Sequence, residues 1–145
     1  MTHSPSARDR WLAPQDWRRD ADSPCLSLGE PGAFDDMHIF APCVAREDDV
    51  YRLWYCGSQG QVDDRVFCLG LATSADGVHF AKHPAPVFGF GDDRHSVLTP
   101  ALLRRPDGAA LREEGRLRMW FAATVFPPGT EPHTLHETTS ADGIT

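Results

Sequence analysis

One turn sequence occurs twice in this chain of 145 residues. The run Thr73-Ser74-Ala75-Asp76-Gly77 returns near the end of the sequence as Thr139-Ser140-Ala141-Asp142-Gly143. Glycine supplies the positive φ angle that a tight hairpin turn needs, and aspartate can hydrogen-bond to the backbone of its own turn. Because five identical residues recur at two expected hairpins, we infer an internal repeat built from β-strands.

Apolar segments precede both turns in the same order, and no segment keeps a helical period over three turns. The expected strands cover residues 39–46, 51–57, 66–74 and 78–87 in the first unit, and 97–103, 117–122 and a segment ending at 140 in the second. Four short antiparallel strands in a unit of about 40–50 residues are typical of a propeller blade. The sequence therefore predicts an all-β fold of about two four-stranded antiparallel blades.

The repeat also predicts how the chain is organised. Residues 1–23 form a polar tail or a leading strand, residues 24–88 the first blade, and residues 89–145 a second blade that stops in its last turn. Trp54 and Trp120 hold the same place in the two units, and we expect both in the core between blades. Two blades do not close a ring, so we expect an incomplete propeller that leaves one apolar blade face open at each end.

Charge and composition exclude several classes of function. The net charge of −7 disfavours binding to nucleic acid or to an anionic membrane surface. No apolar run approaches the roughly 20 residues that span a bilayer, and the polar N-terminus lacks the apolar core of a signal peptide, which predicts a cytoplasmic protein. The four cysteines and seven histidines show no metal-binding spacing, so neither a metal nor another cofactor is expected.

Several motifs together resemble a known fold family. They are Phe34-Asp35-Asp36, Pro42, Leu53-Trp54-Tyr55-Cys56-Gly57 and the run from Leu69 to Phe80. In this order they are similar to a blade of the five-bladed β-propeller glycoside hydrolases, which include arabinanases, β-xylosidases, invertase and levanase relatives and mannoside phosphorylases. The resemblance covers about residues 30–145 and implies an oligosaccharide or glycoside substrate, whose glycosidic bond is hydrolysed by paired carboxylates.

The resemblance also implies where the site lies, near the start of the innermost strand of each blade. The matching residues are Asp35, Asp36 and Asp93 as catalytic carboxylates, and His38, Asp92, Arg94 and His95 as substrate-binding residues. The alternative for the aspartates is a turn-capping role, because Asp accepts backbone N–H bonds in tight turns.

One departure from the family pattern favours a second function. The family commonly carries an Asp directly before the proline of the first strand, whereas this chain has Ala41 and, in the second unit, Thr99. The alternative to a hydrolase is therefore a non-catalytic propeller fragment that binds sugar or a protein partner. A second chain that completes the propeller is the other partner we expect.

Overall fold

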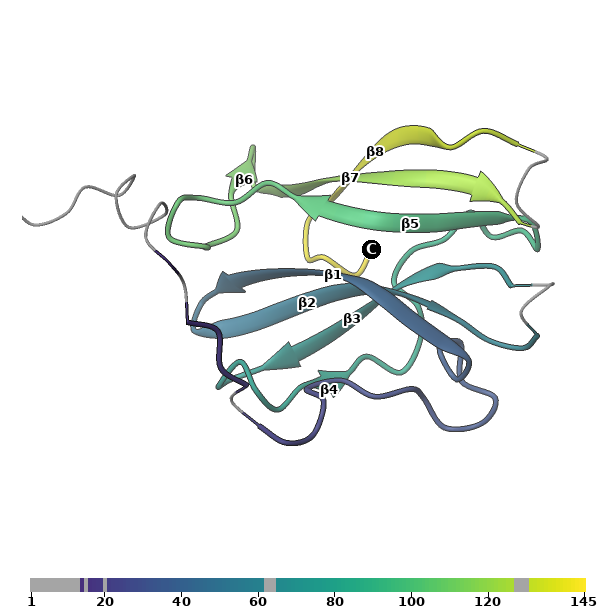
Figure 1. The fold of residues 1–145 in the computed structure, drawn as a ribbon. Coiled ribbons are helices and arrows are strands. Elements are labelled where there is room, and N and C mark those ends of the chain that lie inside the picture. The colour runs from purple at the N-terminus through teal and green to yellow at the C-terminus, as the bar shows by residue number, and fades with distance from the viewer. Residues whose placement is uncertain (1–13, 15, 20, 62–64, 127–130) are drawn as a thin grey trace, which may run out of the picture.

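The structure, a computed structural model, describes residue 14 and residues 16–19, 21–61, 65–126 and 131–145. Its elements are β1 (His38–Glu47), β2 (Val50–Ser58), β3 (Cys68–Ser74), β4 (Ala81–Lys82), β5 (His95–Leu102), β6 (Arg112–Glu113), β7 (Arg116–Val125) and β8 (Thr134–Ser140). They form two four-stranded antiparallel sheets, which lie one against the other (Figure 1). Within these residues there is no helix, and so none that could cross a bilayer. The predicted all-β class is confirmed.

Sheet A contains β1 to β4 in chain order. Three of its strands match the expected segments closely, but the fourth is only two residues long. Val78 and His79, which precede this strand, belong to the turn instead, because their backbone N–H groups donate to Asp76. The segment after it contains Pro84 and Pro86, which have no N–H group to donate to a neighbouring strand. The expected strand over residues 78–87 is therefore much shorter in the structure.

Sheet B repeats this design with one change. Its strand β7 pairs with β5 on one side and β8 on the other, and the short strand β6 pairs with the start of β7. The fourth strand thus comes from the charged segment 105–114, which lies outside the strands expected from the sequence. The central register is the same in both sheets: Trp54 lies opposite Cys43 and Leu71, and Trp120 lies opposite Ala101 and Glu137.

The first strand of each sheet bulges at the same place. Pairing shifts between Phe40 and Cys43 in β1, and between Leu98 and Ala101 in β5. The residue before the proline has a positive φ in both bulges, 52° at Ala41 and 48° at Thr99. Such angles cost a residue with a side chain about 1–3 kcal/mol, so both sheets hold the same strained backbone.

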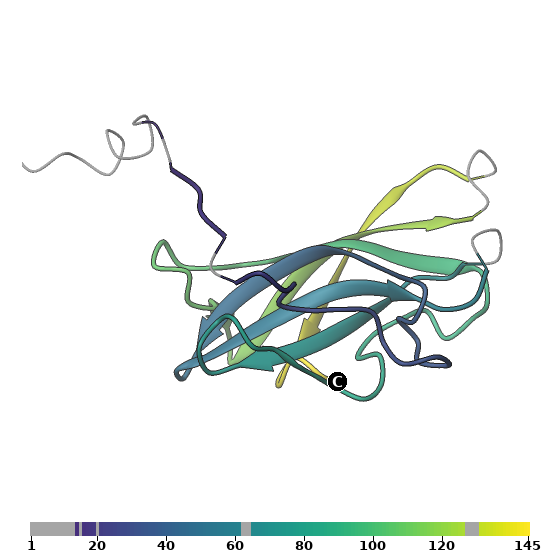
Figure 2. The ribbon, with the colours of Figure 1, turned by 60° about the horizontal axis from the view of Figure 1, so that its bottom comes forward.

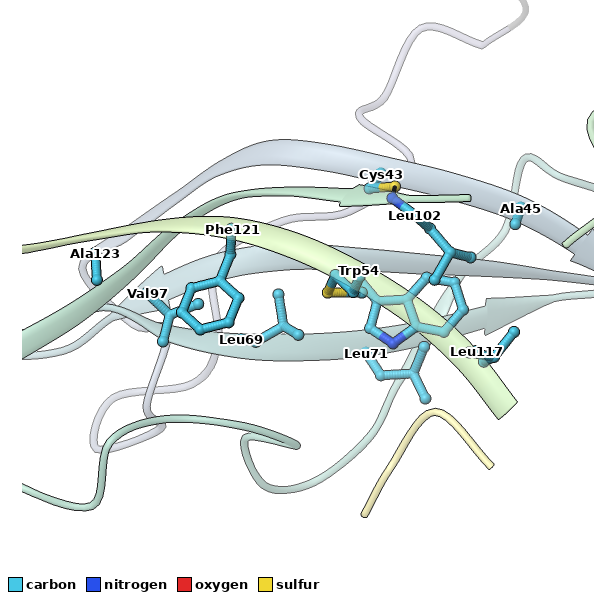
Figure 3. Packing of buried hydrophobic residues seen from close by; sticks show 11 residues of the cluster. Cys43, Ala45, Trp54, Leu69, Leu71, Val97, Leu102, Leu117, Phe121 and Ala123 are labelled. Atoms are coloured by element: carbon cyan, nitrogen blue, oxygen red, sulfur yellow. Dashed lines mark hydrogen bonds between the residues drawn. The ribbon is translucent and has the colours of Figure 1, made fainter. Parts of the chain in front are cut away.

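The main core lies between the two sheets and includes the side chain of Trp54, which is only 1% exposed (Figure 3). Its indole Nε1–H donates to the carbonyl oxygen of Gly143 at 3.1 Å. A Cβ atom on Gly143 would come within 2.9 Å of that indole. The second copy of the repeated turn therefore packs against Trp54 of sheet A. Glycine is required at position 143 for space as well as for its positive φ.

The two repeated turns have the structural role that their sequence indicates. In each, the Asp carboxylate accepts two backbone N–H groups that follow it, from Val78 and His79 in the first and from Ile144 and Thr145 in the second. These bonds favour the ionised carboxylate, so they hold the pKa of Asp76 well below its ordinary value and lower the pKa of Asp142 to about 2.

Trp120 differs from the expectation that both tryptophans are core residues. Its side chain is 38% exposed, on the face of sheet B that points away from sheet A. The outer face of sheet A, in contrast, carries the segment of residues 21–37 across it (Figure 2).

Candidate functional site

Both groups of predicted site residues lie at one end of the two sheets. One group directly precedes or begins β1 and the other directly precedes or begins β5. These two strands are neighbours and run in the same direction, with their arrowheads toward the left of Figure 1. Residues next to β3 connect the groups: Val97 donates its N–H to the Phe67 carbonyl at 2.8 Å, and Phe67 donates to Ser96 Oγ at 3.0 Å. The structure therefore places both groups of predicted residues at the same end of the two sheets.

Asp35 lies at this end of sheet A and is buried, with an exposed fraction of 1%. Its Oδ2 accepts a hydrogen bond from the Tyr55 hydroxyl at 2.9 Å and forms an ion pair with Lys82 Nζ at 2.5 Å. Burial, with a further contribution from the bond to Asp35, raises the pKa of Tyr55 well above its ordinary value, so this hydroxyl remains a donor. Asp35 thus connects its loop to sheet A. Its predicted catalytic role would require Tyr55 or Lys82 to release Oδ2.

Asp36 and His38 are more accessible. Asp36 is half-buried, and its Oδ2 accepts the backbone N–H of Gly32 at 2.7 Å, which is the capping role considered as the alternative. His38 is exposed, and its ring packs against Phe40 and Phe67 at centroid distances of 5.6 and 5.5 Å. Both side chains therefore remain within reach of a ligand at the start of β1.

Asp92 and His95 form a local unit at the start of β5. Asp92 Oδ1 accepts the backbone N–H groups of Arg94 and His95, and its Oδ2 lies 2.7 Å from His95 Nδ1. The bonds from His95 are the main reason that the pKa of Asp92 falls to about 2. A carboxylate this acidic is ionised at neutral pH, so Asp92 can accept hydrogen bonds but cannot serve as a general acid there. Because an ionised carboxylate can only accept, Nδ1–H of His95 is the donor in this contact, and Nε2 is the ring nitrogen that does not contact Asp92.

The same unit occurs elsewhere in the chain without the same surroundings. Asp76 accepts the N–H of His79, and its Oδ2 lies 2.7 Å from His79 Nδ1. Asp-x-x-His is therefore a turn that this sequence uses twice. What distinguishes the copy at Asp92 is the space beside it.

That space, which we call the β5 hollow, has a volume of about 390 Å³. Its wall includes Phe90, Asp92, His95, Glu131, Thr134 and His136. The rings of Phe90 and His95 have a centroid distance of 5.4 Å, and His136 stacks on Phe121 at 5.5 Å. An apolar ring surrounded by carboxylates, a hydroxyl and imidazoles is a typical lining for a small polar ligand.

Two more predicted residues, Asp93 and Arg94, belong to the same loop as Asp92 but do not line the hollow. Arg94 is exposed and forms an ion pair at 3.1 Å with Glu131, which does line the hollow. Asp93 is exposed in the same loop. Asp35, Asp36 and His38 do not line the hollow. The predicted set is thus divided between the starts of β1 and β5.

Sequence reasoning missed Glu131, Thr134 and His136. Glu131 lies in a Pro-rich loop that offered no pattern, and Thr134 and His136 follow it; residues 127–130 of this loop lie outside the described part of the chain. The alternation of Thr134 and His136 at the start of β8 is the one signal that could have placed both side chains on the same face.

Cys56 and Cys68 lie at this end of the sheets as free thiols. Burial raises the pKa of Cys56 to about 12 and also raises that of Cys68, so these thiols remain protonated and are poor nucleophiles. Over the described ranges, no group of three or more His, Cys, Asp or Glu residues is arranged to hold a metal ion.

An acid titration tests the geometry of Asp92. A carboxyl group whose pKa is lowered in the folded state contributes stability above its ordinary pKa of 3.8, and this contribution is lost as the pH falls through about 2. We therefore expect the ¹³C resonance of the Asp92 carboxyl to titrate near pH 2 and to be flat above pH 4. An Asp92→Asn variant, which keeps a side-chain oxygen as acceptor, should lack this titration. A midpoint near 3.8 would contradict the capping geometry.

The fold is shared with solved structures of carbohydrate-active proteins. The chain aligns with a candidate glycoside hydrolase from Bacteroides ovatus at 18% identity and a TM-score of 0.66, over 93% of this chain and 40% of that one. It aligns with a structure described for the GH130 family of mannoside phosphorylases at 20% identity and a TM-score of 0.64, over 89% and 40%. A candidate glycosidase from Bacteroides thetaiotaomicron gives 19% identity and a TM-score of 0.62, over 88% and 40%.

The chain therefore spans about 40% of the length of these structures. At this level of identity the likeness shows a common fold. No protein-family model matches the sequence, and no curated protein sequence does either.

Proposed function

We propose that this chain is a carbohydrate-active module of the glycoside hydrolase type, which binds a glycoside in the β5 hollow. The observation that carries the proposal is the position of Asp92 and His95. Both were predicted to bind substrate, and both line a hollow beside the exposed ring of Phe90. Proteins described as glycoside hydrolases or glycosidases share the fold, which supports the same reading.

Each residue in the hollow has a chemical role in this proposal. The ionised carboxylate of Asp92 accepts a hydrogen bond from a sugar hydroxyl and orients the His95 ring. Nε2 of His95 accepts a hydrogen bond from a second sugar hydroxyl, and Phe90 offers an apolar surface to the carbon face of the sugar ring. The ion pair between Arg94 and Glu131 holds the rim in place.

Bond cleavage in this proposal uses the accessible carboxylates Asp36 and Asp93, which do not line the hollow, so the glycoside extends from the hollow along this end of the sheets to reach them. The pair mechanism needs one group to protonate the leaving oxygen and another to attack or to activate water. Asp35 is the least suited of the three predicted catalytic residues, since both Tyr55 and Lys82 bind its Oδ2. Completion of a five-bladed ring by further sheets, the blade boundaries at residues 24–88 and 89–145, and a cytoplasmic location remain part of the proposal.

Sugar binding without cleavage is the second candidate, and the burial of Asp35 favours it. The two candidates share the hollow and differ in whether product forms. Incubating the protein with the same sugars and measuring released reducing ends separates them, with Asp36→Asn and Asp93→Asn as the variants that should abolish any cleavage.

Binding itself can be tested by saturation-transfer NMR and calorimetry on the full chain. The probes are β-1,2-mannobiose, the linkage named for a GH130 structure, together with xylobiose and arabinobiose. For the sugar that binds, His95→Ala should weaken affinity by about tenfold, because a hydrogen bond contributes about 1–1.5 kcal/mol and 1.4 kcal/mol is a factor of ten.

His79→Ala is the matched control, because it removes the same Asp-His contact from a turn that does not line the hollow. Equal loss of affinity in both variants, or no binding of any of the three sugars, would overturn the proposed site.

A further inference from the structure

The charges, hydrogen-bond groups and rings of the β5 hollow narrow the chemical class of its ligand. We propose that the hollow selects a protonated amino group, so that the glycoside it binds is that of an amino sugar. The sugar part of this inference rests on the proposed function, whereas the ammonium part rests on the hollow itself.

Both charged side chains that line the hollow are negative. They are Asp92 and Glu131, and among the described residues of the wall there is no lysine or arginine. The lowered pKa of Asp92, about 2, keeps its carboxylate charged at neutral pH. Arg94 pairs with Oε1 of Glu131 but does not line the hollow, so the wall and this neighbour together still carry a net negative charge. The hollow therefore favours a cation over a carboxylate or phosphate.

The two imidazoles of the wall each keep an acceptor nitrogen. His95 donates Nδ1–H to Asp92, which leaves Nε2 as its acceptor. The Thr134 hydroxyl donates to the carbonyl oxygen of Ala123 at 3.4 Å, so its oxygen accepts Nε2–H of His136 at 2.8 Å. Nδ1 is then the acceptor nitrogen of His136.

The side chains of the wall thus have acceptors to offer, while their donors are used within the protein. The remaining donor, the Thr124 hydroxyl, is bonded to the carbonyl oxygen of Glu131 at 3.3 Å. A sugar hydroxyl brings one donor together with two acceptor lone pairs, whereas an ammonium group brings three donors and no acceptor. The protonated amine is therefore the sugar substituent that matches this wall.

Aromatic rings in the same wall suit an organic cation better than a metal ion. Phe90 is 40% exposed, and its ring centroid lies 5.4 Å from that of His95 and 5.9 Å from that of His136. The planes of Phe90 and His136 meet at 80°, so these two rings form a corner of the hollow. The face of an aromatic ring attracts an ammonium group. In the described part of the chain, no three His, Cys, Asp or Glu residues are arranged to hold a metal ion.

NMR titration of the full chain at pH 7 measures the preference, with the ring resonances of His95 and His136 as reporters of the hollow. The probes are the β-1,4-linked disaccharide of glucosamine, its N-acetylated form and cellobiose, which differ only in the group at C2. We expect the free amine to bind about tenfold more tightly than the other two, because an exposed ion pair and an exposed cation–π contact each contribute roughly threefold. Added salt should reduce this ratio, since it screens the ion pair.

Two variants assign the preference to the carboxylates. Glu131→Gln and Asp92→Asn should each lower the ratio of amine to hydroxyl affinity by about threefold, because each removes one negative charge. Glu137→Gln is the matched control, since this glutamate also pairs with an arginine, Arg118, but does not line the hollow. The control should leave the ratio unchanged, and circular dichroism melting confirms that all three variants are folded.

The outcomes separate this inference from the proposed function. Cellobiose that binds as tightly as the amine would overturn the ammonium preference and leave the sugar site standing. Tetramethylammonium that binds as tightly as the amino sugar, with no binding of cellobiose, would keep the cation site and overturn the sugar site. No binding of any of these probes would overturn both. A preference that Glu131→Gln and Asp92→Asn leave intact would also contradict the inference.

Discussion

Replacing Asp35 by Ala should lower the free energy of unfolding by about 3–5 kcal/mol, because it leaves a partly buried lysine without its ion-pair partner. Lys82 Nζ lies 2.5 Å from the lost carboxylate, and its side chain is 23% exposed. The Tyr55 hydroxyl loses its acceptor in the same change. Since small domains are stable by only about 5–15 kcal/mol, we expect a large decrease of the denaturation midpoint in urea.

Asp36→Ala is the control for this experiment. The neighbouring carboxylate is half-buried and accepts a single backbone hydrogen bond from Gly32, so its loss should cost about 1 kcal/mol. Similar midpoints for both variants would mean that Asp35 does not hold its loop to sheet A. Its predicted catalytic role would then regain support.

Replacing Trp54 by Ala should cost about 3–5 kcal/mol, the usual range for removing a buried aromatic side chain. The indole fills the space between the sheets and donates to Gly143, so the variant loses both core packing and the bond that closes the C-terminal turn. We expect loss of the cooperative thermal transition or a strong decrease in its midpoint, measured by circular dichroism.

Trp120→Ala is the matched control, since it makes the same change at the same register position of the other sheet. The side chain is 38% exposed there, so the loss should be well under half as large. Equal losses would mean that Trp120 is covered in solution even in the single chain.

The sequence predicted the sheets better than the site, for a physical reason. Turn chemistry and strand patterns act locally, so the Asp76 and Asp142 turns and the strand that carries Trp54 could be anticipated. The short β4 shows where this fails, because Pro84 and Pro86 remove donors from a segment whose pattern indicated a longer strand.

The site depends on contacts between distant residues, which a pattern does not encode. Nothing near Asp35 in the sequence indicates that Lys82 and Tyr55 bind its carboxylate. The hollow depends in the same way on Glu131 and His136 reaching the loop that carries Asp92. By contrast, the bond between Asp92 and His95 spans three residues, and its Asp-x-x-His spacing could have been read from the sequence together with Asp76 and His79.

The paired bulges have a consequence for the residues that can occupy them. Ala41 and Thr99 both hold left-handed backbone angles, a region where Asp and Asn are enriched and where a β-branched side chain such as threonine is an outlier. An acidic residue would therefore fit either position with less backbone strain than the present one. The main chain at both bulges already has the shape that would present a carboxylate in front of each proline, although this sequence carries none there.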